Sequence, residues 1–174
     1  LSVRRMLEPM RRVRMAPCTI TPSLGCCPWH TPQFFADLDG DGDVDLMSST
    51  YMAPNQVWRN DQGTFSEVSD SVLGGANVNH IVLLPADYNG DGLVDIFEGN
   101  EWFVANRLIR NMGNWTFEED RNFDNSWSDP ACMGATWGDI DRDGDVDLLI
   151  RNTMQTSELY LNKAGTLVKE HGTA

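Results

Sequence analysis

The sequence predicts an all-β fold in which three four-stranded antiparallel blades of a β-propeller form an incomplete ring. An aspartate-rich loop occurs three times, beginning at Asp37, Asp87 and Asp139, so that the copies lie 50 and 52 residues apart. A repeat of this length is typical of propellers and other repeat arrays. In addition, no window shows a sustained helical period of apolar residues, and Gly or Pro interrupts most candidate helices.

Each repeat contains four expected strands in the same order. One apolar segment precedes the loop, a second follows it, and a hairpin around a Gly-containing turn completes the repeat. The first and second strands are expected at 34–36 and 44–47, 81–84 and 94–97, and 133–137 and 146–150. The hairpin strands are expected at 55–60 and 64–68, 106–111 and 116–119, and 157–162 and 166–169. Four such strands make one propeller blade.

The repeats define the domain organisation. Residues 1–30 form a basic, cysteine-containing segment that is expected to be irregular, and the blades are expected at about 31–70, 78–120 and 131–171. A β-sandwich of twelve short strands is the alternative, but it does not explain why the same loop recurs at the same place. Propellers have about four to eight blades. We therefore expect further blades in the same chain, or another chain, to complete the ring, and the sequence is interpreted as a piece of a longer protein.

The three loops have the composition of sites for a hard cation. Calcium takes roughly six to eight oxygen ligands at about 2.3–2.6 Å. Side chains at loop positions one, three, five and nine, with the backbone carbonyl of position seven, can converge if the glycine at position six makes a sharp turn. The valine at position eight is expected to point inward and anchor the loop. The candidate metal-binding residues are Asp37, Asp39, Asp41, Asp43 and Asp45, then Asp87, Asn89, Asp91, Leu93 and Asp95, and finally Asp139, Asp141, Asp143, Asp145 and Asp147.

We expect calcium, up to three ions, as the cofactor. Magnesium demands stricter geometry and keeps more of its waters, whereas zinc and copper prefer His or Cys, which the loops lack. Ordinary solvated turns are the alternative for a single loop of this kind. Three copies in register, each leading into an apolar run, favour metal binding.

The second loop also satisfies the EF-hand pattern, because Glu98 stands at position twelve. The equivalent residues of the other loops are Ser48 and Ile150, which cannot supply a bidentate carboxylate. An EF-hand also needs a helix on each side. Here Pro85 comes two residues before the loop and the following segment is expected to be a strand, so the EF-hand is the less favoured interpretation.

The three loops, the Asn-x-x-x-x-Asn hairpin strands and the segment Leu73-Gly74-Gly75-Ala76 resemble the FG-GAP/VCBS repeat family. Its calcium-loop blades also occur in the head of integrin α subunits. The similarity covers roughly residues 31–170. It implies calcium between the first two strands of each blade, a complete ring of about seven blades, and a ligand-binding or adhesive role outside the cytoplasm. The chain departs from the family in having three units and in the erosion of the Phe-Gly and Gly-Ala-Pro signatures.

The net charge of −13 is unevenly distributed. Residues 1–14 contain five arginines and one glutamate, whereas 13 of the 26 acidic residues are loop aspartates. The basic segment is either a targeting or partner-contacting arm or poorly ordered sequence. The part of the chain that is expected to fold is strongly acidic, which argues against nucleic acid as a partner. No segment has the length and hydrophobicity of a transmembrane span. An extracellular, cell-surface, periplasmic or lumenal location is inferred from the resemblance and the calcium chemistry, although no secretory signal is visible.

The cysteines leave several pairings open. Cys18, Cys26 and Cys27 precede the first blade, and Cys132 precedes the third. A bridge from Cys18 to Cys26 or to Cys27, a bridge that involves Cys132, and free thiols are all compatible with the sequence, because connectivity cannot be deduced from it.

The residues do not suggest an active site, so we expect a non-enzymatic module. No nucleophile elbow or phosphate loop occurs. Glu98 and Glu101 could in principle form a hydrolytic pair, but a charge on a connecting strand usually lies on a solvated face. The expected function is calcium-dependent recognition or adhesion of a protein or a glycan. A structural subunit docked in a larger complex and the propeller part of a carbohydrate-active enzyme are the alternatives.

Several tryptophans are candidates for contact with a sugar or a partner. Trp102, Trp115 and Trp127 lie in the second repeat or in the connection after it, although filling gaps between blades is the alternative. Trp58 and Trp137 align with apolar residues of other repeats and are expected in the core.

Overall fold

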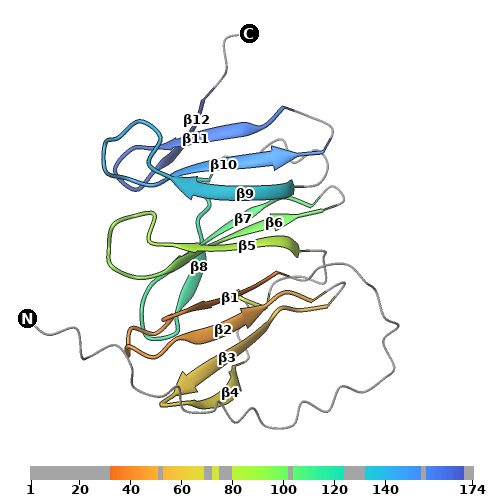
Figure 1. Cartoon of the computed structure of the whole chain (residues 1–174), viewed down its shortest axis with the longest axis vertical. Helices are drawn as coiled ribbons and strands as arrows, with labels where there is room; N and C mark the ends of the chain where they lie inside the picture. Colours follow the sequence, from red (N-terminus) through yellow and green to blue (C-terminus); the bar gives the residue numbers. More distant parts are fainter. Residues whose placement is uncertain are drawn as a thin grey trace, which may run out of the picture.

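The computed structural model describes residues 32–50, 53–68, 72–74, 80–101, 104–123, 132–153 and 156–170. Within these ranges the regular structure consists of three four-stranded antiparallel sheets and no helix (Figure 1). The first sheet contains β1 (Gln33–Ala36), β2 (Asp45–Ser48), β3 (Gln56–Asp61) and β4 (Thr64–Val68). The second contains β5 (His80–Ala86), β6 (Asp95–Asn100), β7 (Arg107–Asn111) and β8 (Phe117–Glu119). The third contains β9 (Cys132–Gly138), β10 (Asp147–Asn152), β11 (Glu158–Asn162) and β12 (Leu167–Glu170).

The predicted all-β fold of three four-stranded blades is confirmed. In each sheet the strands are ordered as they occur in the sequence, so that every blade is a simple meander. The blades stack face to face, and their first strands, β1, β5 and β9, lie side by side (Figure 1). All strands fall inside the blade bounds expected from the sequence. The basic segment 1–30, with its three cysteines, lies outside the described residues.

The hairpin of each blade depends on backbone conformations with positive φ. In the first blade Gln62 and Gly63 have φ of 52° and 88°, and in the third blade Ala164 and Gly165 have φ of 51° and 84°. Two consecutive residues of this kind form the type I′ turn that matches the twist of a two-residue hairpin. The turn of the second blade is longer, and Asn114 and Trp115 follow Gly113 with positive φ.

The hydrophobic core consists of two layers, each between two neighbouring blades. The first layer contains Leu38, Met47 and Val57 of blade one and Leu83, Ile96, Ile109 and Phe117 of blade two. The second contains Val82, Tyr88, Phe97 and Leu108 of blade two and Leu148, Ile150, Tyr160 and Leu167 of blade three. Each layer also includes one residue of the connection between blades, Leu73 or Phe123. Adjacent strand residues therefore point to opposite neighbours, as Ile96 and Phe97 do.

The position-eight valines differ from the sequence expectation. Val94 and Val146 are half-buried and pack against the layer toward the preceding blade, but Val44 is 50% exposed. The prediction that this valine anchors each loop is therefore wrong for Val44, because no described blade precedes it. The fully buried hydrophobic residue of the first two loops is at position two, where Leu38 and Tyr88 are covered by the following blade.

The tryptophan expectation holds only in part. Trp137 packs against the second layer, stacks on Tyr88 and donates its indole N–H to the carbonyl of Leu84 at 3.5 Å. Trp58 is only half-buried, because its face of blade one has no described neighbour. Whether a tryptophan is buried thus depends on the presence of a neighbouring blade as well as on its position in its own blade.

Cys132 is a buried free thiol at the start of β9. Burial raises its pKa to about 11, so the thiol is unreactive at neutral pH. A Cβ atom on Gly99 would lie 2.5 Å from the Cys132 sulfur. Only glycine therefore fits where β6 approaches β9.

An asparagine at or next to the end of the third strand joins the second and third blades to the blade before each of them. The Asn111 side chain donates from Nδ2 to the carbonyl of Val94 in its own loop at 3.1 Å and to that of Leu38 in the preceding loop at 2.9 Å. In the third blade, Asn162 makes the same two bonds to Val146 at 3.0 Å and Tyr88 at 2.6 Å. In each blade the asparagine Oδ1 also accepts a bond from a turn glycine at 2.8–2.9 Å.

Replacing Asn162 by Ala should therefore destabilise the protein more than the same change at Asn60. Asn60 bonds to its own loop at Val44 but to no preceding described loop. A buried carbonyl that loses its partner costs about 1–3 kcal/mol. We expect the free energy of unfolding, measured by urea denaturation, to fall by about that much more in Asn162→Ala than in Asn60→Ala. Equal losses in the two variants would show that the contact between blades contributes little.

Candidate metal centres

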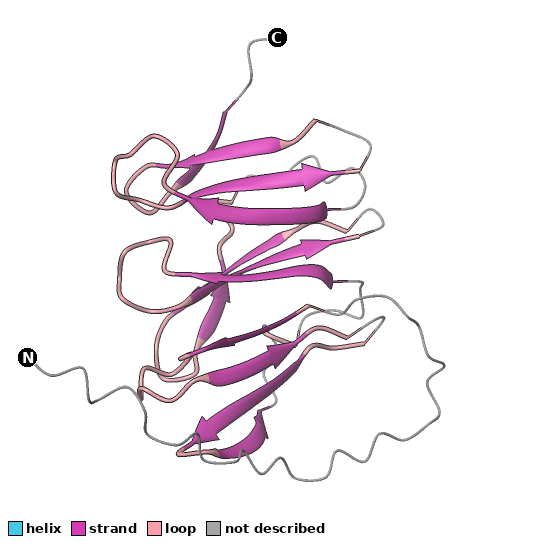
Figure 2. Ribbon diagram, in the orientation of Figure 1, coloured by secondary structure: helices cyan, strands magenta, loops and turns pink. Residues whose placement is uncertain are grey.

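The three aspartate loops lie at the same edge of the stack (Figure 2). Each loop joins the first strand of its blade to the second, so that residues 37–45, 87–95 and 139–147 occupy equivalent places. Strands flank every loop on both sides, which excludes the EF-hand interpretation of the second one.

The loop backbone turns at two positions, not one. The glycines at position six, Gly42, Gly92 and Gly144, have φ of 92°, 87° and 100°, as their role in the turn requires. Position four also has positive φ: 80° at Gly40, 74° at Gly90 and 63° at Arg142. Sequence reasoning missed this second turn, although glycine at position four in two of the three loops was a signal for it.

The first aspartate of a loop holds the loop backbone in place. Asp37 accepts hydrogen bonds from the N–H groups of Gly40 at 2.7 Å and Gly42 at 2.9 Å. Asp87 makes the equivalent bonds to Gly90 and Gly92 at 2.8 and 2.9 Å. Both carboxylates therefore stay at the centre of their loops.

The ninth aspartate of each loop is completely buried. Asp45 accepts bonds from the backbone N–H groups of Leu38 and Asn60, both at 2.8 Å. Asp147 accepts the equivalent bonds from Ile140 at 2.7 Å and Asn162 at 2.8 Å. These carboxylates join the loop to the hairpin of the same blade.

Asp95 in the second loop is held less completely. Its Oδ1 accepts a bond from the Asn111 N–H at 2.8 Å, whereas Oδ2 has no partner in good hydrogen-bond geometry. The backbone N–H of Tyr88 nevertheless lies close enough to lower the pKa of Asp95 in part. Burial raises the pKa of Asp95 to about 7, and it raises the pKa of Asp45 as well. A nearby positive charge would favour the ionised form of both groups.

Three carboxylates converge in the first and third loops. One oxygen each of Asp37, Asp39 and Asp45 lies within 4.8 Å of the others, and the same holds for Asp139, Asp141 and Asp147. In the second loop the middle position is Asn89, whose amide oxygen replaces the carboxylate. These oxygen donors fit the preference of calcium for hard ligands. The ligand assignment itself stays a prediction.

The side chains at positions five and seven accept hydrogen bonds from backbone N–H groups. The carboxylates of Asp43 and Asp145 accept bonds from the hairpin turn, from Gln62 N–H at 2.8 Å and from Ala164 N–H at 3.2 Å. The backbone carbonyls of Asp43, Leu93 and Asp145 are the groups at position seven that are predicted from the sequence to bind a metal. Asp41, Asp91 and Asp143 accept a bond from the N–H two residues ahead at 2.8–3.0 Å.

Two cationic side chains pair with the loops. Arg59 Nε lies 3.0 Å from Asp39 Oδ2 in the first loop. Lys163 Nζ lies 2.7 Å from Asp141 Oδ2 in the third, and this pair lowers the pKa of Asp141 and raises that of Lys163. Both pairs reduce the repulsion among the loop carboxylates. The Lys163 pair is exposed and contributes little to stability, whereas the Asp39 carboxylate of the other pair is nearly buried.

Trp115 connects the second blade to the loop of the first. Its indole N–H donates to Asp39 Oδ2 at 2.9 Å, and its ring packs against the first core layer and edge-on to Phe117. A cleft of about 360 Å³ lies beside it, lined by Asp39, Gly40, Asp41, Arg59, Asn114 and Trp115. Trp102 and Trp127, the other two candidates, lie outside the described residues.

Glu98 is fully buried, so the expectation that it lies on a solvated face is wrong. It accepts bonds from Arg107 Nη1 at 2.8 Å and from Asn55 Nδ2 at 2.9 Å. Burial raises its pKa to about 7, and Arg107 opposes this shift. Because Asn55 belongs to blade one, Glu98 serves as a polar contact between blades. It is held in this network rather than beside a metal.

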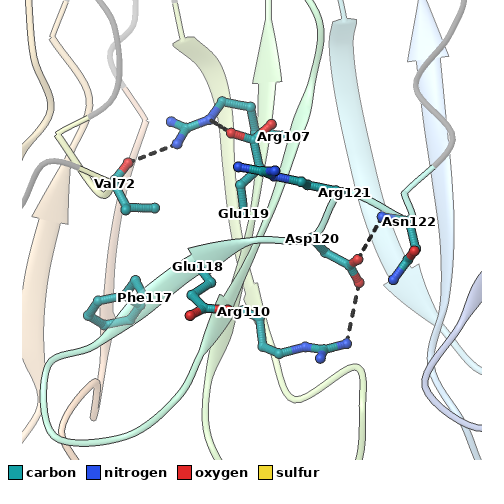
Figure 3. A pocket seen from close by; sticks show the side chains of 9 residues that line it. All are labelled: Val72, Arg107, Arg110, Phe117, Glu118, Glu119, Asp120, Arg121 and Asn122. Carbon is teal, nitrogen blue, oxygen red and sulfur yellow. Dashed lines mark hydrogen bonds and ion pairs between the residues drawn. The ribbon is translucent and has the colours of Figure 1, made fainter.

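A larger, polar pocket of about 710 Å³ lies along β8 (Figure 3). It is lined by Val72, Arg107, Arg110, Phe117, Glu118, Glu119, Asp120, Arg121 and Asn122. Arg107 pairs with Glu119 at 3.3 Å and Arg110 with Asp120 at 3.4 Å. The lining therefore carries equal numbers of guanidinium and carboxylate groups, in contrast to the acidic loops.

The fold and the repeated loops define a protein built of propeller blades. The chain belongs to the FG-GAP-like repeat family, whose model matches residues 37–98 and 87–150. The resemblance noted in the sequence is therefore confirmed. A comparison with curated proteins finds no match.

Among solved structures, the chain is similar to an Agrocybe aegerita lectin described for specific recognition of non-reducing terminal N-acetylglucosamine. The sequence identity is 22% and the TM-score 0.48, over 79% of this chain and 36% of the lectin chain. The match thus spans little more than a third of that lectin. Within the described residues, no helix has the length and apolar character needed to cross a membrane.

Replacing Arg142 by Gly should stabilise the protein. Arg142 is the non-glycine residue at loop position four, with φ of 63°, where the other two loops have glycine. Left-handed backbone in a non-glycine residue costs on the order of 1 kcal/mol. The greater freedom of glycine in the unfolded chain offsets part of this gain, as it does at any position. We therefore expect a smaller net gain, on the order of 0.5 kcal/mol, in the free energy of unfolding. It is measured with chelator present so that cation binding does not contribute.

The matched control is Arg151→Gly, in which the same side chain is removed from an exposed position of β10. Glycine in a strand costs roughly 0.5–1 kcal/mol, so this variant should be less stable than the parent. A loss of stability in Arg142→Gly would contradict the strain assigned to position four.

Proposed function

We propose that this chain is a calcium-binding FG-GAP repeat module that acts in non-enzymatic recognition or adhesion of a protein or a glycan. The observation that carries the proposal is the convergence of three carboxylates within 4.8 Å in the first and third loops. Three carboxylates this close together, one of them buried, would repel one another without a cation, because water screens their charges only in part. Here hydrogen bonds to the backbone hold them together.

Different side chains of a loop have different roles. In the first two loops the first aspartate orders the loop by accepting bonds from its N–H groups. In all three blades the ninth aspartate is fixed by the hairpin of its blade. A bound calcium ion would supply the positive charge that offsets the crowded carboxylates. The position-two carbonyls of the first two loops are tied to the next blade by Asn111 and Asn162, so ordering of a loop also orders the contact between blades.

The cleft beside the first loop is the part of the described surface that we propose for ligand contact. It combines the carboxylates of Asp39 and Asp41 with the guanidinium of Arg59, the amide of Asn114 and the indole of Trp115. Closely spaced donors and acceptors beside an aromatic ring suit a polar ligand such as a sugar. An extracellular or lumenal location is part of this proposal, since sites of modest calcium affinity are typical of extracellular modules.

Calcium should raise the thermal stability of the protein strongly. Ligands that bind only the folded form stabilise it by mass action, by about 2.7 kcal/mol for one site at a concentration 100-fold above Kd. Melting curves recorded with chelator and with excess calcium should therefore separate, and magnesium should have a smaller effect. Coincident curves would contradict the proposal.

Calorimetric titration with calcium measures the number of ions that each variant binds, so that a loop variant can be compared with a control. Asp139→Asn combined with Asp141→Asn should lower the number of bound ions, because it removes two of the three converging carboxylates of the third loop. Glu170→Gln, which neutralises an exposed acid on β12, should leave the number unchanged.

Recognition of a glycan should depend on calcium in the same way. A glycan array probed with the intact chain should give signals in calcium that disappear in chelator, because the first loop forms one wall of the cleft. Arg59→Ala should weaken these signals without lowering the number of bound ions. Release of free sugar during the incubation would instead favour a carbohydrate-active enzyme. Signals that persist in chelator would show that glycan binding does not depend on cation binding in the loops, and would contradict this prediction.

A further inference from the structure

The two outer faces of the stack carry the two halves of the interface that joins its blades. Equivalent residues of the three repeats follow from the strand register, which aligns Met47, Phe97 and Leu149 on the second strands. In the first two blades this position is buried against the next blade. The outer faces can therefore be compared residue by residue with two completed interfaces in the same chain.

The outer face of blade three keeps the apolar residues of a covered face. Leu149 is 37% exposed, whereas Met47 and Phe97 are fully buried. At loop position two, Ile140 is 52% exposed, whereas its equivalents Leu38 and Tyr88 are 0% and 2% exposed. Blade three thus presents the surface that blades one and two present to the blade after them.

The outer face of blade one keeps the complementary half. Phe35 is 56% exposed, whereas its equivalent Trp137 packs in the second core layer. Val44 is likewise exposed, although Val94 at the same position packs against the first layer. Leu46, Trp58 and Phe65 on this face are half-buried, and their equivalents in the other blades are fully or almost fully buried.

The donor and the acceptor of the hydrogen bond between blades also occur on different outer faces. Asn60 Nδ2 donates to Val44 of its own blade, but among the described residues it has no carbonyl of a preceding loop as a second acceptor. The carbonyl of Ile140 stands where those of Leu38 and Tyr88 accept such a bond. The donor lies on one outer face and the acceptor on the other.

We propose that two copies of this chain associate head to tail, with the outer face of blade three in one copy against the outer face of blade one in the other. Two such contacts join the six described blades of two copies into a closed ring, and six lies within the range of about four to eight blades found in propellers. Closure by repeated contacts of one kind is the usual result of heterologous interfaces whose rotation completes a circle. Each new contact would repeat the packing already present twice inside the chain, with Asn60 donating to the carbonyl of Ile140.

The test is the mass of the intact chain in solution, measured by light scattering during size-exclusion chromatography over a broad range of concentration. We expect the mass of two chains. Leu149→Asp and Phe35→Asp should each weaken the dimer at least about tenfold, because a charge would be buried in an apolar contact. Met112→Asp is the matched control: Met112 is 48% exposed in the hairpin turn of the middle blade, and Asp61 occupies its place in blade one. This variant should remain dimeric.

Mixing the two face variants distinguishes head-to-tail association from contact between like faces. The Leu149→Asp chain keeps an intact blade-one face and the Phe35→Asp chain an intact blade-three face, so their mixture should recover one contact and part of the dimer. Circular dichroism and melting curves of each variant establish that it is folded. A chain that stays monomeric at every concentration, or a mass that neither variant changes, would overturn the proposal.

Discussion

The stack depends on the bond between the buried aspartate that ends each loop and the asparagine that ends the third strand. The carboxylate accepts the asparagine N–H at 2.8 Å in all three blades. The side chain of the same asparagine binds the loop carbonyl before that aspartate and, in the second and third blades, a carbonyl of the preceding loop. Because these groups are buried, an unmade bond among them would cost far more than an exposed one. In the second and third blades, one aspartate–asparagine pair therefore fixes the loop, the hairpin and the contact with the preceding blade together.

This arrangement makes the chemistry of the loops inseparable from the fold. The carboxylate that anchors the loop to the hairpin is also one of the three that converge in the first and third loops. The neighbouring blade reaches the loops as well, since Trp115 bonds to Asp39 and a Cβ atom on Gly165 would lie 3.3 Å from the Asn89 backbone. The first two loops are thus confined by the blade that follows them. A change of charge in one of these loops should accordingly change the stability of the contact between blades.

The sequence predicted the strands and loops well because both depend on local patterns. The spacing of the aspartates, the glycine at position six and the hairpin turns are readable from a few adjacent residues. The exposure of Val44 and the burial of Glu98 were not predictable in this way, because both depend on the residues of another blade. Glu98 is held by Asn55, which belongs to blade one and lies 43 residues away in the sequence, and by Arg107 on the adjacent strand of its own blade. The left-handed conformation of Arg142 was not predicted, because arginine does not indicate a turn at position four as the glycines of the other two loops do.

A stack of repeats is close to one-dimensional, because each unit contacts only its neighbours. Terminal repeats that end such a stack usually replace apolar interface residues by polar ones. Blade one and blade three do not: Phe35, Leu149 and Ile140 stand at positions where the interior interfaces place apolar residues. The polar donor and acceptor of the interface are retained in the same way, at Asn60 and Ile140. Both ends therefore have the composition of interior faces, and a neighbour with the same blade structure satisfies their apolar and polar groups together.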